Sequence, residues 1–290
     1  AFVTFLYAYY RSLKRFYFFN VMQILVQAVI LMFVFISRNN LILLIYLVGI
    51  VISFVSLVLI LFYTKKYHKV AHIKSIKDLK PDFKELVGFC WPRVPGDLFL
   101  FALATVPLII LKQKIGDYNT TGFAISIMIN TMVTSLFSFF GMVLLPYVSK
   151  SVHVGDYNEV DEKIKRLGLI YSAIAIAGVL GIYLFTSLII RILYSSEYLV
   201  YKDTVRIIAI SILPNAAYLL IRNPIDAISN FPYNTINLGI TFSALTAMLL
   251  FFDNIKHYAY SFVISYLILG VLSLLSWIFA RKRSRKKGGY

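Results

Sequence analysis

The chain has 290 residues, of which 60% are hydrophobic and only 14% charged, with a formal net charge of +16 and a mean hydropathy of +0.79. A water-soluble domain of this composition would expose far more apolar surface than such domains tolerate. Long unbroken apolar runs also exclude a transmembrane β-barrel, whose strands alternate apolar and polar residues. The composition therefore predicts an all-α, polytopic transmembrane helical bundle.

Membrane spans are predicted in chain order after an apolar remnant at residues 1–10. The eight complete spans cover 16–36, 41–63, 89–111, 122–148, 167–193, 204–221, 233–252 and 257–280. A polar segment rich in lysine separates the second and third spans at 64–88, and a mixed-charge segment lies at 149–166. A turn is expected at 112–121, around Gly116, and a loop at 194–203. The helix of the span at 204–221 is expected to continue through Arg222 and Asp226.

These spans predict four parts. Residues 1–63 would be the end of a first helical lobe, 64–88 a basic cytoplasmic linker, 89–280 a second lobe of six helices, and 281–290 a basic cytoplasmic tail. Six helices after a long linker are a natural half of a transporter built from two repeats. Because the chain opens at Ala1 within an apolar run, without a methionine or a charged leader, we expect it to be the later part of a longer protein.

The basic residues predict an orientation. Of the 29 lysines and arginines, 21 lie in alternate loops that include the C-terminal tail, 7 lie at the opposite ends of the spans, and Arg93 lies within a span. Such a bias marks the cytoplasmic side. A multi-pass protein of the cell (cytoplasmic) membrane with a cytoplasmic C-terminus is therefore predicted. Basic residues placed at helix ends give no indication of nucleic-acid binding.

Two pairs of charges recur in the same pattern within apolar runs. Arg93 and Asp97 are four residues apart, as are Arg222 and Asp226. That spacing puts each pair on one helical face, where its members can form an ion pair. Both pairs fall near the predicted cytoplasmic ends of their spans. Since a charge inside a membrane helix costs at least about 2.5–3.5 kcal/mol, such residues usually face protein or water.

The two arginines are candidates for binding an anion, because guanidinium donates paired hydrogen bonds to phosphate. The alternative is that the pairs are structural, or that the arginines extend toward the inner head groups. Asn215, in the middle of its span beside Pro214, is a candidate polar liner of the same cavity, or a hydrogen-bonding contact between helices.

No hydrolytic, redox or metal-binding set is recognisable, so neither an enzyme nor a cofactor is predicted. His68 and His72 share a helical face but lie in the lysine-rich linker, where a solvated face explains them. Cys90 is the single cysteine, which excludes an intramolecular disulfide. Ala173, Ala177 and Gly181 form a stripe of small residues that ordinary packing within the bundle explains.

Three stretches carry a resemblance to a known family. They are FCWPRVPGD at 89–97, LLPYVS at 144–149 and LIRNPIDA at 220–227. They resemble the polysaccharide flippases, which are the O-antigen and teichuronic-type transporters of the multidrug, oligosaccharidyl-lipid and polysaccharide (MOP) exporter superfamily. The similarity covers most of the chain from about Arg11 onward, and it implies the last part of a first lobe followed by a whole second lobe.

The resemblance implies translocation of a polyprenyl-pyrophosphate-linked oligosaccharide from the inner to the outer leaflet by alternating access. Arg93 and Arg222 would meet the pyrophosphate, and Asp97 or Asp226 would carry a coupling ion, H⁺ or Na⁺. The partners would be this anionic lipid-linked glycan and the membrane lipids. Two alternatives stay open at this point: a multidrug-type exporter of the same superfamily, which would favour an acidic cavity, and a membrane-embedded glycan polymerase or acyltransferase, which would need a catalytic set.

Overall fold

The computed structural model describes residues 24, 28, 32, 43, 46–51, 54, 55, 58, 76–153 and 157–287. The chain divides into two compact units, Ala1–Asp82 and Phe83–Tyr290. In the first unit the described residues are helical. The predicted spans at 16–36 and 41–63 are described only in part, and His68 and His72 lie outside the described residues.

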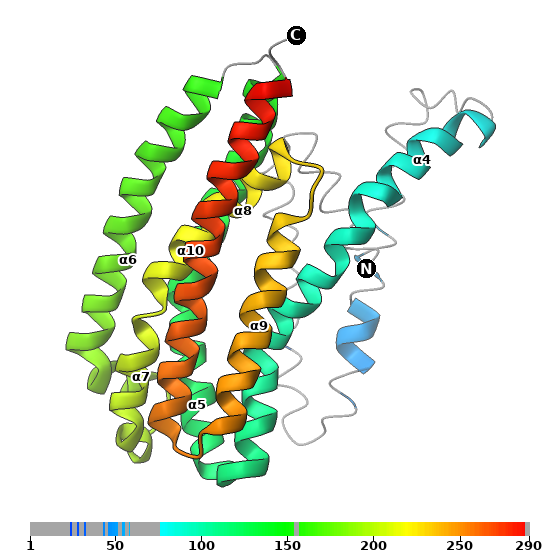
Figure 1. Cartoon of the computed structure of the whole chain (residues 1–290). Helices are drawn as coiled ribbons and strands as arrows, with labels where there is room; N and C mark the ends of the chain where they lie inside the picture. The colour runs from blue at the N-terminus through cyan, green and yellow to red at the C-terminus, as the bar shows by residue number, and fades with distance from the viewer. Residues whose placement is uncertain are drawn as a thin grey trace. The chain divides into compact units, whose positions relative to one another are not determined.

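The second unit is a bundle of helices (Figure 1). Its described residues form helices and turns and no strand, so the prediction of an all-α fold is confirmed. The elements, the first of which starts at the end of the first unit, are α4 (Ile76–Cys90), η1 (Trp91–Arg93), α5 (Val94–His153), α6 (Tyr157–Leu193), η2 (Ser196–Tyr201), α7 (Lys202–Ala209), α8 (Ile212–Ile228), α9 (Tyr233–Phe251) and α10 (Ile255–Lys287).

Four helical stretches among the described residues are long and apolar enough to cross a membrane: Phe83–Phe137, Glu159–Leu193, Tyr233–Phe251 and Ile255–Ser284. A fifth is obtained if Ser196–Ala209 and Ile212–Ile228, which meet at an angle of 44°, form one broken span. A helix of about 20 apolar residues is sufficient to cross the hydrocarbon core. The helices are thus consistent with a multi-pass membrane protein.

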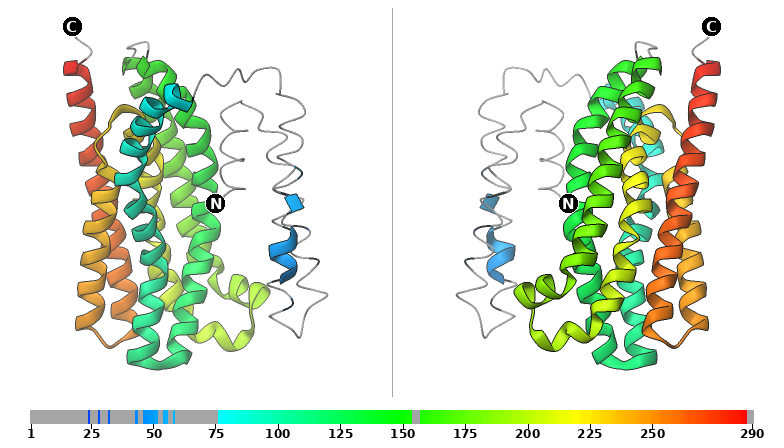
Figure 2. Two further views of the ribbon diagram at one scale, coloured as in Figure 1. Left: turned by 90° about the vertical axis from the view of Figure 1, so that its right-hand side faces the viewer. Right: turned by 90° about the vertical axis from the view of Figure 1, so that its left-hand side faces the viewer.

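The long helix α5 is folded at Gly116, which has φ 84° and ψ 172°. This backbone conformation is accessible almost only to glycine, because a side chain would clash with the backbone. Figure 2 shows the two arms of α5 joined at the lower end of both views. The predicted turn is therefore present, but it is a single residue between two helical arms and not a ten-residue loop.

Several helices extend beyond the apolar runs from which spans were predicted. α10 continues through the basic tail to Lys287, and α5 and α6 take up most of the mixed-charge segment, from which only 154–156 are not described. The predicted loop at 194–203 is also wrong, since it contains η2 and the first residues of α7. The physical reason is that hydropathy reports where a helix leaves the membrane, whereas lysine, arginine and glutamate are good helix formers and let it continue into water.

Helix α8 lies between two apolar clusters. Its residues Ile212, Ala216 and Leu220 pack with α6 and the later arm of α5, whereas its Tyr218 packs with α9, α10 and the first arm of α5. It also comes close to α10, because a Cβ added to Gly270 would lie 2.8 Å from the carbonyl oxygen of Pro214. The packing of α8 between these clusters therefore determines which residues of neighbouring helices its two ends contact.

Lys114 holds the first arm of α5 against the end of α9. Its ammonium group donates hydrogen bonds to the carbonyl oxygens of Leu249, Leu250 and Phe252, at 3.4, 2.6 and 3.2 Å, and pairs with Asp253 at 3.0 Å. A cation is favourable there because the last carbonyls of a helix have no partners within it. This arm of α5 is thus fixed at its Gly116 end, and its other end carries the predicted charged residues.

Candidate functional site

The two predicted charge pairs come together where η1 and the first turn of α5 meet the last turns of α8. Pro92, in η1, sits at a helix start, where its missing N–H needs no partner. Gly96, in the first turn of α5, allows α5 to approach α9 closely. A Cβ added to Gly96 would lie 2.9 Å from the side-chain oxygen of Thr235, in the first turn of α9. Pro224 lies inside α8 without ending it, and α8 continues to Ile228 as predicted.

The ion pairs form between the helices and not within them. Arg93 Nε lies 3.3 Å from Asp226 Oδ1, and Arg222 Nη2 lies 2.8 Å from Asp97 Oδ1. The expectation of i, i+4 pairs is therefore wrong in its partners. The reason is that α5 and α8 are antiparallel, so a step of four residues up one helix matches a step of four residues down the other, and each arginine meets the aspartate of the opposite helix. The result is a square of alternating charge, which we call the charge square (Arg93, Asp97, Arg222 and Asp226).

Within the charge square, each nitrogen of the Arg93 guanidinium donates a hydrogen bond. Besides Asp226, its guanidinium donates hydrogen bonds to the carbonyl oxygens of Phe89 (2.6 Å) and Ser229 (2.8 Å). The guanidinium carbon also lies 3.6 Å from the centre of the Phe89 ring, in a cation–π contact. The side chain is 16% exposed. Arg93 thus fastens the loop after α8 to the start of α5.

Arg222 is bound more loosely. Its side chain is 30% exposed, and the carboxylate of Asp97, which it meets through Nη2, is 75% exposed. Among the described residues, Nε and Nη1 of Arg222 have no hydrogen-bond acceptor, although the Tyr218 ring lies 6.0 Å from the guanidinium carbon. A guanidinium with free donors beside an exposed carboxylate can bind a second anion, because its unused N–H groups can donate the two hydrogen bonds of a bidentate contact.

Polar atoms near Arg222 are also without partners. Asn234 Nδ2 donates a hydrogen bond to the backbone oxygen of Arg222 at 2.8 Å, but Asn234 Oδ1 is buried and has no partner in the described part of the chain. The same is true of the Tyr218 hydroxyl. Because most buried polar atoms in proteins are hydrogen-bonded, such atoms call for an explanation, and a binding site is one.

Asn215 lies on the face of α8 that carries Tyr218 and Arg222, about two turns deeper in the bundle. Its side chain is buried, at 9% exposure of the residue, and no hydrogen bond joins it to another described residue. The interhelical amide contact is instead made by Asn237, which donates to Ser276 Oγ at 3.0 Å. The structure therefore places Asn215 on the same face of α8 as Arg222, two turns away from the charge square and without contact to it.

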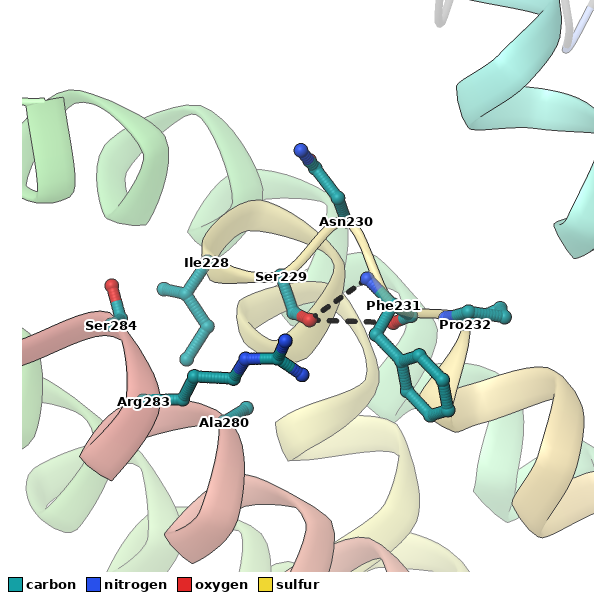
Figure 3. Close-up of a pocket in the computed structure, with 8 residues that line it drawn as sticks. All are labelled: Ile228, Ser229, Asn230, Phe231, Pro232, Ala280, Arg283 and Ser284. Carbon is teal, nitrogen blue, oxygen red and sulfur yellow. Dashed lines mark hydrogen bonds between the residues drawn. The ribbon is translucent and has the colours of Figure 1, made fainter. Parts of the chain in front are cut away.

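A pocket of about 400 Å³ lies next to the charge square, between the loop after α8 and the end of α10. Figure 3 shows the guanidinium of Arg283 extending toward Ser229, the residue whose carbonyl oxygen binds Arg93. Sequence reasoning missed Ser229 and Arg283. Arg283 could have been found by continuing the helix of α10 into the basic tail, whereas Ser229 acts through its backbone oxygen and leaves no signal in its residue type.

Within the described residues, no group of three or more histidine, cysteine, aspartate or glutamate side chains could hold a metal ion. The site residues offer charge and hydrogen bonding by guanidinium, carboxylate, amide and phenol groups.

The chain was compared with protein-family models, with curated proteins and with solved structures, and none of them matches it.

Proposed function

We propose that this chain belongs to a transporter that moves a polyprenyl-pyrophosphate-linked oligosaccharide from the inner to the outer leaflet of the cell membrane. The proposal starts from the resemblance of residues 89–97, 144–149 and 220–227 to polysaccharide flippases. It is supported by the helical bundle and by the meeting of two arginines at one end of it, the end that the distribution of basic residues assigns to the cytoplasm.

The observation that carries the proposal is the incomplete coordination of Arg222. A pyrophosphate bears several negative oxygens in the geometry that guanidinium binds best. Arg222 has free donors for such a group, whereas Arg93 has its donors engaged by Asp226 and two backbone oxygens. We therefore assign contact with the pyrophosphate to Arg222 and positioning of the loop after α8 to Arg93.

The architecture fits a second lobe. Five crossings are available when the broken pair of η2–α7 and α8 counts as one. If the two arms of α5 on either side of Gly116 each cross the membrane, the number rises to the six of the proposed lobe. In alternating access, such a lobe would rock against a first lobe around a fixed site.

Asp97 is the proposed carrier of the coupling ion. It is the most exposed member of the charge square, and it holds Arg222 through one hydrogen bond. Neutralising the carboxylate by H⁺, or drawing it to Na⁺, would release Arg222 for the anionic substrate. Asp226, which is 26% exposed and bonded to Arg93, is the second candidate.

The test uses the natural gene in its own cell, with display of the glycan at the surface as the readout. Arg222→Ala should lower display roughly 10- to 100-fold, because a charge-assisted hydrogen bond to the substrate contributes about 1.5–3 kcal/mol. Arg222→Lys should retain part of the activity, since the charge stays but the bidentate geometry is lost. Membrane insertion of each variant is checked by blotting the membrane fraction.

The same experiment separates the alternatives. A multidrug-type exporter that takes cations would depend on Asp97 and Asp226 and tolerate Arg222→Ala. The matched control is Arg206→Ala, since Arg206 binds the backbone oxygen of Tyr183 and lies outside the charge square. Normal glycan display from an inserted Arg222→Ala protein would remove the basis of the proposal.

A further inference from the structure

A second hollow lies on the side of α8 opposite the charge square. It has a volume of about 570 Å³ and is lined by α6, α8 and Leu274 of α10. This volume lies within the range of ligand sites, about 300–1,000 Å³. On α8, the residues that line the hollow include Ala216 and Leu220, which are turned roughly half a circle away from Arg222 at about 100° per residue. The hollow is therefore separate from the proposed transport site.

Small side chains create this groove. Gly168, Ser172 and Ala175 line it from α6, and Ala216 and Ala217 line it from α8. Adjacent helices normally fill such a space with larger side chains. Here α6 and α8 touch at Gly168, where an added Cβ would lie 3.4 Å from Leu220, and they leave space further along.

The groove has a polar end and an apolar length. Lys165 stands at one end, two residues before the apolar run of α6 begins at Leu167. Its ammonium group has no ion-pair partner among the described residues. Toward the middle of the span, the lining is apolar except for Ser172 and the Tyr171 hydroxyl, which is bonded to the backbone oxygen of Phe137. A charge at the interface and an apolar channel leading inward match the two ends of a phospholipid.

An ion pair joins α6 and α10 beyond the end of the groove that carries Lys165. Arg281 of α10 pairs with Asp161 of α6. Asp161 is one turn before Lys165 on α6, and Arg281 is two turns beyond Leu274 on α10. Lys165 is therefore the cation that a ligand in the groove meets among the residues that line it.

We propose that this groove binds one acyl chain of a phospholipid whose anionic head group pairs with Lys165. Apolar association alone gives no preference over bulk lipid, because acyl chains are as apolar as the groove. The selectivity comes from the head group, since one basic residue near the membrane surface enriches an anionic lipid roughly fivefold. The site requires only that these helices cross a membrane, so it stands whether or not the chain moves a glycan.

The experiment measures lipid retention by native mass spectrometry. The full chain is purified in detergent and offered equal amounts of phosphatidylglycerol and phosphatidylcholine with identical acyl chains. The wild-type chain should retain phosphatidylglycerol in preference, and Lys165→Ala should reduce that preference roughly fivefold. Lys282→Ala is the matched control, because it removes the same charge at the same predicted side and Lys282 does not line the groove. Equal retention of the two lipids, or an equal effect of the two lysine variants, would overturn the proposal.

A second pair of variants tests the acyl chain. Ser172→Phe should fill the groove and abolish retention of both lipids, whereas Ala173→Phe, on the adjacent exposed position, should leave it unchanged. Ala217→Leu fills the other wall and serves if Ser172→Phe does not fold. Retention that ignores both fillings would show that the acyl chain lies outside the groove, which contradicts the proposal. Displacement of the lipid by millimolar inorganic phosphate would show a head-group site without a chain site, which also contradicts the proposal.

Discussion

Arg93 and Arg222 carry the same charge but are held in different ways. Arg93 makes three hydrogen bonds and a cation–π contact, and Arg222 makes one hydrogen bond to an exposed carboxylate. A fully coordinated guanidinium fixes structure, because releasing it would leave its acceptors without donors. A partly coordinated one is available to a ligand. The two residues should therefore respond differently to substitution.

Breaking the two ion pairs should have different effects on the free energy of unfolding. Arg93→Ala leaves Asp226 and the carbonyl oxygens of Phe89 and Ser229 without a donor, so we expect a loss on the order of 3 kcal/mol in the free energy of unfolding. Asp97→Asn removes a carboxylate that is 75% exposed, and we expect a change below about 1 kcal/mol. Unfolding of the purified chain by temperature or by denaturing detergent measures both. Equal losses would contradict the distinct roles.

The sequence alone could single out these four residues as candidates, but it could not predict how they pair. Arginine and aspartate recur four residues apart at the same predicted depth, and this pattern identifies Arg93, Asp97, Arg222 and Asp226 as candidates. Their partners depend on whether the two spans are adjacent and in what register, and that is decided by packing at positions such as Gly96 against Thr235. Asn215 shows the same limit, since its helical face could be predicted but not the absence of a contact to the charge square.

At the scale of helices, close approaches are set by particular glycines. A Cβ at Gly270 would lie 2.8 Å from the backbone oxygen of Pro214, whereas a Cβ at Gly181 would meet no atom within 4 Å. The small-residue stripe that was expected to serve ordinary packing thus ends in open space at Gly181, and its Ala173 and Ala177 are exposed. The helices approach one another at other positions.

Two alanine substitutions test this difference. Gly270→Ala should destabilise the chain by about 1–3 kcal/mol, because α8 or α10 must shift to relieve the overlap. Gly181→Ala should be neutral or stabilising by up to about 1 kcal/mol, since alanine has the higher helix propensity and the space is open. Thermal unfolding in one detergent compares the two variants directly. A stable Gly270→Ala protein would show that α8 and α10 are not closely packed there.

The helix ends were predicted less well than the helices. The span expected at 233–252 is α9, at Tyr233–Phe251, and the span expected at 257–280 lies within α10. The errors fall where charged residues continue a helix, as at Arg281–Lys287, or where a short element replaces a loop, as at η2. The length of an apolar run predicts where a helix crosses a membrane and says little about where that helix stops in water.

At the scale of the whole molecule, the orientation can be tested with the native sequence. Cys90 is the only cysteine, and it is exposed at the end of α4. The excess of lysine and arginine on one side predicts that this end faces the cytoplasm. A membrane-impermeant maleimide should therefore label Cys90 in inverted membrane vesicles and not in intact cells. In a Cys90→Ser background, Asn254→Cys, in the turn between α9 and α10, should show the opposite pattern. Labelling of Cys90 from outside would reverse the proposed direction of transport.

The charge square also restricts how the bundle can move. If α8 slid along α5 by one turn in either direction, Asp97 would face Asp226 or Arg93 would face Arg222. Both displacements replace attraction with repulsion between like charges. The observed register of α5 against α8 is therefore favoured over the registers one turn away. The charge square joins the start of α5 to α8, and Lys114 joins the far end of the same arm to α9, so α5, α8 and α9 should move together as a stiff unit. Any rearrangement that exposes a cargo to the opposite side of the membrane would then occur by tilting this unit against other helices, and not by sliding of α8 along α5.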